Sequence, residues 1–137
     1  MAECALRLGF EHITIVDGDK VERSNLNRQN YTENDIGRYK AECLTERLQS
    51  INPDAQIDYH TEFLNPDNIE EMLNGHNVAI NALDFKDNTP FVFDRICKEK
   101  KSPYFIHTIL DGRGLSRLLI LWDIPCPNWQ TSQKALN

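Results

Sequence analysis

Residues 17–40 concentrate side chains that can bind a nucleoside triphosphate. The candidate groups in this segment are the carboxylates of Asp17 and Asp19, the cations of Arg28 and Lys40, and the amides of Asn25 and Gln29. Carboxylates can accept hydrogen bonds from ribose hydroxyls or bind a metal ion, and fixed cations can pair with phosphate oxygens. This mixture predicts a nucleotide site within one short stretch of chain.

Composition limits the classes of protein that could carry such a site. The chain has 137 residues, 40% of them hydrophobic, which suits the core of one domain, and we treat residues 1–137 as that domain. The net charge of -6 indicates no basic surface for nucleic acid or anionic lipid. No apolar run approaches the roughly 20 residues that cross a bilayer, and the amino terminus lacks a signal-peptide pattern. We therefore expect a cytoplasmic protein with no direct nucleic-acid or membrane partner.

The four cysteines and four histidines do not form a recognisable metal or redox motif. The cysteines are widely separated, without the Cys-x-x-Cys spacing of zinc ribbons or dithiol redox sites. Cys43 and Cys97 fall on the apolar faces of predicted helices, so we expect them to be small buried hydrophobes. Cys126 lies between two prolines, and its reactivity stays open.

Predicted strands alternate with predicted helices along the chain. Strands are expected at residues 12–16, 56–63, 77–83, 104–110 and 115–122. Helices are expected at residues 2–8, 38–51, 65–75 and 89–101. This alternation predicts right-handed crossovers and an α/β fold with a doubly wound, mainly parallel sheet. Ligands of such sheets bind beyond the carboxyl ends of the strands, where Asp17 and Asp84 each follow a predicted strand.

The position of Asp17 predicts that the sheet lacks its usual first strand. An acid at this strand end commonly lies about 20 residues after a glycine-rich turn. Counting back from Asp17 passes Met1, and the chain contains no Gly-x-Gly-x-x-Gly. The absent strand would be central in the order 3-2-1-4-5, so two inner edges would be left unpaired. We expect direct pairing of the flanking strands, or a homodimer that includes a swapped form, to close the gap.

Three motifs occur in order along the first half of the chain. They are DGDKVERSNLNRQ at residues 17–29, GRYK at residues 37–40 and INP at residues 51–53. Together they resemble the ThiF/MoeB/HesA family, which is related to ubiquitin-activating enzymes, and the resemblance extends from the amino terminus to about residue 121. It implies a Rossmann-like fold and ATP-dependent adenylation of the carboxy-terminal carboxylate of a ubiquitin-like or sulfur-carrier protein, with Mg²⁺ as the usual cofactor.

The resemblance also implies roles for individual residues. Asp17 would bind the ribose hydroxyls, Asn25 and Arg28 the phosphates, and Lys40 the charge of the α- and β-phosphates. Preplaced cations of this kind stabilise charge that develops on phosphate oxygens in the transition state. The remaining members of the candidate nucleotide-binding set are Asp19 and Gln29.

The same resemblance assigns the magnesium ion and a catalytic role to Asp84. The surrounding sequence departs from the family pattern, because Asn81 stands where many members have an acid and Phe85 where they have Asn. Asp87, which precedes an Asn, is therefore a competing candidate for the metal ligand.

Three hypotheses about function follow. The chain is an ATP-dependent adenylyltransferase, or an incomplete relative that acts as a binding module or subunit partner without turnover. In the third hypothesis it is a fragment whose activity belongs to a longer native chain. The sequence identifies neither the carrier protein nor the pathway.

Overall fold

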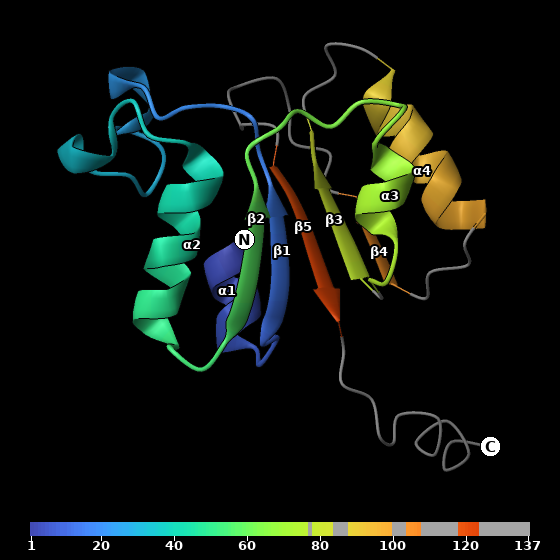
Figure 1. Ribbon diagram of the computed structural model, residues 1–137, viewed down its shortest axis with the longest axis horizontal. Coiled ribbons are helices and arrows are strands. Elements are labelled where there is room, and N and C mark those ends of the chain that lie inside the picture. Colours follow the sequence, from blue (N-terminus) through green and yellow to red (C-terminus); the bar gives the residue numbers. More distant parts are fainter. Residues whose placement is uncertain (77, 84–87, 100–103, 108–117, 124–137) are drawn as a thin grey trace.

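The computed structural model describes residues 1–76, 78–83, 88–99, 104–107 and 118–123. Helices and strands alternate within these ranges (Figure 1). The helices are α1 (Ala2–Arg7), α2 (Lys40–Ile51), α3 (Ile69–Leu73) and α4 (Thr89–Glu99), with two short 3-10 helices, η1 (Arg23–Asn25) and η2 (Glu33–Asp35). The strands are β1 (His12–Val16), β2 (Gln56–His60), β3 (Val78–Ala82), β4 (Tyr104–His107) and β5 (Leu118–Asp123). Of the helices in these ranges, none has the length and hydrophobicity to cross a membrane.

The strands form one five-stranded sheet in the order β2-β1-β5-β3-β4. β1 runs parallel to β2, and β3 runs parallel to β4. β5 is antiparallel to both β1 and β3, so β1 and β3 point in the same direction. The predicted α/β fold with a mainly parallel sheet is therefore confirmed.

The centre of the sheet corrects one expectation. β5 lies where we predicted a gap, with Ile120 paired to Ile15 on one side and to Ile80 on the other. Neither direct pairing of the flanking strands nor a second copy of the chain closes the sheet. An antiparallel strand from the same chain does so, because its backbone N–H and C=O groups can pair with both inner edges.

Two hydrophobic clusters cover opposite faces of the sheet, as a doubly wound fold requires. Ile13 and Ile15 of β1 belong to a cluster that includes residues of α1 and α2. Val16 points to the other face and belongs to a cluster with residues of α3 and α4. Figure 1 shows α1 and α2 beside β2 and β1, with α3 and α4 beside β3 and β4. Both faces of β1 are thus covered by packing.

The end of β2 and the start of α3 differ from the sequence prediction for local reasons. β2 ends at His60 rather than at residue 63, and its last carbonyl accepts a hydrogen bond from Asp17 N at 3.1 Å. α3 begins at Ile69 rather than near Asn65, and a hydrogen-bonded turn precedes it. Asn65 Oδ1 accepts bonds from the amides of Asp67 (2.9 Å) and Asn68 (3.1 Å), and the Asn65 carbonyl accepts one from Ile69 N at 3.1 Å, which is the pattern of an N-cap.

Gly18 marks a close approach between the end of β1 and the loop after β2. A Cβ at this position would lie 2.8 Å from Phe63 N and 2.9 Å from the carbonyl carbon of Glu62. These are backbone atoms, so we expect Gly18→Ala to lower the free energy of unfolding in urea by about 1–3 kcal/mol. Unchanged stability would contradict this close packing. Amide exchange near Phe63 should also speed up in Gly18→Ala, because the close contact lies at this backbone.

Candidate functional site

A short clasp joins the end of β1 to the start of α2. The Asp19 carbonyl accepts a hydrogen bond from Lys40 N, Val21 N donates to the Arg38 carbonyl, and Gly37 N donates to the Val21 carbonyl, each at 2.9 Å. Gly37 permits the turn because its φ is +85°. α2 consequently begins at Lys40, not at Arg38 as predicted, because residues 37–39 pair with residues 20 and 21.

The clasp brings together Asp17, Asp19 and Lys40, which we call the acid–lysine cluster. Asp17 is buried directly after β1, and its Oδ1 accepts a hydrogen bond from Asp19 N at 2.9 Å. Lys40 Nζ lies 3.2 Å from Asp19 Oδ2. The Lys40 side chain is 6% exposed, whereas that of Asp19 is 38% exposed. The cluster therefore combines a buried carboxylate, a buried ammonium and a carboxylate that reaches solvent.

The other members of the candidate set belong to η1. Asn25 is buried, and its Oδ1 caps η1 by accepting a hydrogen bond from Glu22 N at 2.9 Å. The Asn25 carbonyl also accepts bonds from the amides of Arg28 (3.1 Å) and Gln29 (2.8 Å). Arg28 is exposed and Gln29 is half-buried. Asn25 thus organises the segment that carries Arg28, while the guanidinium itself lies at the surface.

The predicted metal ligands, Asp84 and Asp87, lie outside the described residues. β3 ends at Ala82 and points toward the same edge of the sheet as the end of β1. Buried Asn81 turns the chain at this edge, since its Oδ1 accepts a hydrogen bond from Leu83 N at 3.0 Å. Within residues 1–76, 78–83, 88–99, 104–107 and 118–123, no group of three or more acidic, His or Cys residues could hold a metal ion.

The sequence did not reveal the contribution of Tyr31. Its phenol donates a hydrogen bond to the Lys40 carbonyl at 3.5 Å, which places the ring beside the first turn of α2. Burial, followed by the negative charge of Asp17, raises the pKa of Tyr31 well above its usual value. The phenol therefore stays protonated and remains a donor. The contact spans a loop, and no local sequence pattern marks it.

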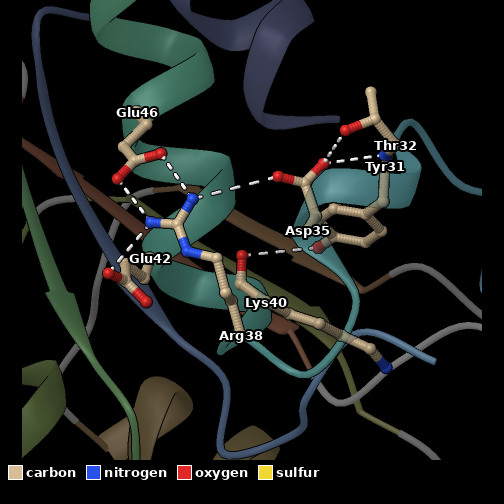
Figure 2. Close-up of polar contacts among 7 residues, drawn as sticks. All are labelled: Tyr31, Thr32, Asp35, Arg38, Lys40, Glu42 and Glu46. Atoms are coloured by element: carbon tan, nitrogen blue, oxygen red, sulfur yellow. Dashed lines mark hydrogen bonds and ion pairs between the residues drawn. The ribbon is translucent and has the colours of Figure 1, made fainter.

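Arg38 lies beside the site, but its guanidinium is held in ion pairs with acidic side chains. Figure 2 shows its guanidinium between Glu42, Glu46 and Asp35, with the Lys40 side chain directed away from these groups. The Arg38–Glu42 pair spans 3.0 Å, and the Arg38–Asp35 pair spans 4.0 Å. Hydrogen bonds to Glu46 and Glu42 raise the pKa of Arg38, and the bond from Arg38 lowers the pKa of Glu46. The spacing of four residues between Arg38 and Glu42 is the signal that could have revealed this pair.

Asp35, which also lies near Arg38, stabilises the start of η2. Its Oδ2 accepts hydrogen bonds from Thr32 N at 2.7 Å and Thr32 Oγ1 at 2.8 Å. The backbone bond from Thr32 is the largest cause that lowers the pKa of Asp35. Thr32 and Asp35 have the spacing of a capping box, so the start of η2 could have been predicted.

Cys43 is buried on α2, as predicted. Burial raises the pKa of its thiol to about 11, so very little thiolate is present near neutral pH. We expect iodoacetamide at pH 8 to label the exposed Cys4 and to leave Cys43 unmodified until the protein unfolds. Peptide mass spectrometry after a timed reaction measures both sites. Equal labelling of Cys4 and Cys43 in the folded protein would contradict the burial of this face.

A cavity of about 490 Å³ lies between α3 and the β1–β2 pair. Its lining comprises Thr14, Ile57, Asp58, Tyr59, His60, Glu71, Met72 and His76. His76 Nδ1 lies 3.1 Å from the Asn74 carbonyl and therefore carries a hydrogen, while its Nε2 lies 2.9 Å from Thr14 Oγ1. None of the residues predicted to bind nucleotide lines this cavity, so it is distinct from the acid–lysine cluster.

Comparison with known proteins places these features in a family. The model of the ThiF family matches residues 1–132. Sulfur carrier protein ThiS adenylyltransferase from Bacillus subtilis is 31% identical over 128 residues, which cover 91% of this chain and 38% of that protein. SAMP-activating enzyme E1 from Haloferax volcanii is 30% identical over 122 residues, which cover 87% of this chain and 44% of that protein.

A solved structure agrees with these sequence matches. The crystal structure of Escherichia coli tRNA N6-threonylcarbamoyladenosine dehydratase in complex with ATP has a TM-score of 0.75 and 30% sequence identity. The match covers 84% of this chain and 47% of that one, so the chain spans less than half the length of each of these three relatives. The family model covers nearly the whole chain, and the sequence and fold therefore show that this protein belongs to the ThiF family.

Proposed function

We propose that this chain binds ATP and adenylates the carboxy-terminal carboxylate of a ubiquitin-like or sulfur-carrier protein. The observation that carries the proposal is the acid–lysine cluster at the carboxyl end of β1, where a buried ammonium lies 3.2 Å from a carboxylate that reaches solvent. Ligands of doubly wound sheets bind at this edge. Relatives with 30% and 31% identity are named as a SAMP-activating enzyme and a ThiS adenylyltransferase, which supports the class of substrate.

The residues of the site fit the groups of ATP. Asp17 is a buried acceptor suited to ribose hydroxyls, and Lys40 is a buried cation suited to phosphate oxygens. Asn25 and Arg28 would bind phosphates from η1, Gln29 would complete the set, and Asp19 would position the ammonium of Lys40. Asp84 is proposed as the Mg²⁺ ligand, with Asp87 as the alternative, and bound Mg²⁺ would neutralise phosphate charge.

The proposed step is an in-line displacement at the α-phosphorus. A carboxylate oxygen of the carrier forms a bond to this phosphorus while the bond to the oxygen that bridges the α- and β-phosphates breaks. Pyrophosphate leaves with that electron pair, and the products are an acyl-adenylate and pyrophosphate. The clasp fixes the backbone of Lys40 and Asp19 holds its ammonium at 3.2 Å, so the cation would be in place for the charge that develops on the phosphate oxygens.

ATP–pyrophosphate exchange with candidate carrier proteins tests the proposal. We expect radiolabelled pyrophosphate to enter ATP only when a carrier with a free carboxy terminus is present, and a carrier with an amidated terminus is the control. Carrier binding without exchange would favour the alternative function, a binding module or subunit partner without turnover. Absence of both exchange and ATP binding would contradict the proposal.

Arg28→Ala measures the role of the exposed guanidinium. If Arg28 closes onto the phosphates, the exchange rate should fall about 10²-fold or more, as when one preorganised transition-state donor is removed. Arg95 is also an exposed arginine but lies on α4. Arg95→Ala is therefore the matched control and should leave the exchange rate unchanged. A loss below about 3-fold in Arg28→Ala would argue against a role in catalysis.

A homodimer remains a separate prediction. Its original reason, an unpaired gap at the centre of the sheet, no longer applies because β5 pairs with both β1 and β3. Light scattering across a range of protein concentrations measures the molar mass, and a mass that stays at one chain would contradict the dimer.

A further inference from the structure

We propose that Asp19 weakens the binding of free phosphate anions at the acid–lysine cluster, because its carboxylate competes with phosphate for the ammonium of Lys40. The inference rests on the proposed function and adds a means of regulation to the same site. Its basis is the 3.2 Å contact between Lys40 Nζ and Asp19 Oδ2. A phosphate bound by Lys40 must share that ammonium with an existing negative charge.

Lys40 has little freedom to leave Asp19. Its side chain is 6% exposed, and a buried ammonium requires an anionic partner. Its backbone is also fixed, since Lys40 N donates to the Asp19 carbonyl at 2.9 Å and Tyr31 donates to the Lys40 carbonyl at 3.5 Å. Any phosphate therefore meets the ammonium beside Asp19.

Asp19 is fixed in turn, and its carboxylate reaches solvent. Its amide donates to Asp17 Oδ1 at 2.9 Å, while its carboxylate is 38% exposed. An anion that approaches Lys40 from solvent comes close to this carboxylate, and like charges at such short range repel. The nearby guanidinium of Arg38 is paired with Glu42 and Glu46, so it does not offset the repulsion (Figure 2).

Asp19→Asn tests the inference because it removes the charge and retains an oxygen acceptor for Lys40. Adenosine, AMP and inorganic pyrophosphate are titrated into the protein by calorimetry in EDTA. We expect Asp19→Asn to bind AMP and pyrophosphate about 10-fold more tightly than the wild type, with unchanged affinity for adenosine. Asp54→Asn, an exposed acid beyond the carboxyl end of α2, makes the same change in net charge and should change no affinity.

A double variant connects the effect to the lysine. Adding Lys40→Met to Asp19→Asn should abolish the gain for AMP and pyrophosphate. Circular dichroism checks folding, and Asp19→Ser supplies a second neutral variant. Phosphate affinity that is equal or weaker in the folded neutral variants, or no pyrophosphate binding by any variant, would overturn the inference. A pyrophosphate gain in a protein that binds neither adenosine nor AMP would instead support the inference and contradict the proposed function.

Discussion

Lys40→Met is expected to slow ATP–pyrophosphate exchange by about 10²-fold or more, because the variant loses a preorganised cation at the phosphates. Met preserves most of the length and the apolar character of the buried stem. Asp19, which reaches solvent, can be hydrated once the ammonium is gone, so the fold should persist. Initial exchange rates at saturating carrier, with circular dichroism as a check on folding, give the result.

Lys98→Met is the matched control for this variant. Lys98 is an exposed lysine on α4 whose Nζ also pairs with a carboxylate, that of Asp94 at 2.6 Å. The same chemical change should therefore leave the exchange rate unaltered. Similar rates for Lys40→Met and the wild type would show that the buried ammonium does not act on the phosphates.

Asp17→Asn is expected to lose most of the discrimination between ATP and 2′,3′-dideoxy-ATP. Hydrogen bonds from ribose hydroxyls to a carboxylate contribute about 1.5–3 kcal/mol each, so the wild type should bind ATP at least about 10-fold more tightly than the dideoxy nucleotide. In Asp17→Asn the two affinities should differ by no more than about 3-fold. The four Kd values form a thermodynamic cycle. This cycle measures whether the substitution of Asp17 and the removal of the ribose hydroxyls affect the same contact.

Asp54→Asn controls for the change in net charge and should keep the full preference for ATP. A preference for ATP that survives in Asp17→Asn would mean that another group binds the ribose. Equal affinities for the two nucleotides in the wild type would likewise contradict the role of Asp17. Either result would move the nucleoside away from the end of β1.

Local patterns predicted most elements because their causes are local. The helical spacing of Ala41, Leu44 and Leu48 predicted α2, and these residues form its buried or partly buried face. The apolar run near residue 120 predicted β5 as a strand. Its central antiparallel position could not be predicted, since it depends on two partners that are far away in the sequence. Non-local pairing of this kind leaves no local signal.

The candidate site was predictable in composition but not in its contacts. The motifs indicated Asp17, Asp19 and Lys40 as candidate site residues. The pairing of Asp19 with Lys40, however, depends on backbone hydrogen bonds across the clasp. The role of Tyr31 could not be predicted for the same reason, because its contact with Lys40 crosses a loop. Arg28 was named with the others, and the structure places it at the surface.

The central claim is that nucleotide binds where β1 meets α2, and an NMR titration tests it most directly. Uniformly ¹⁵N-labelled protein is titrated with ATP, and amide shifts are followed for every assigned residue. The account predicts that the largest changes fall within residues 17–40, above all at Asp19 and Lys40, whose amides belong to the clasp. Absence of any change, or changes confined to the cavity beside Thr14 and His76, would contradict it.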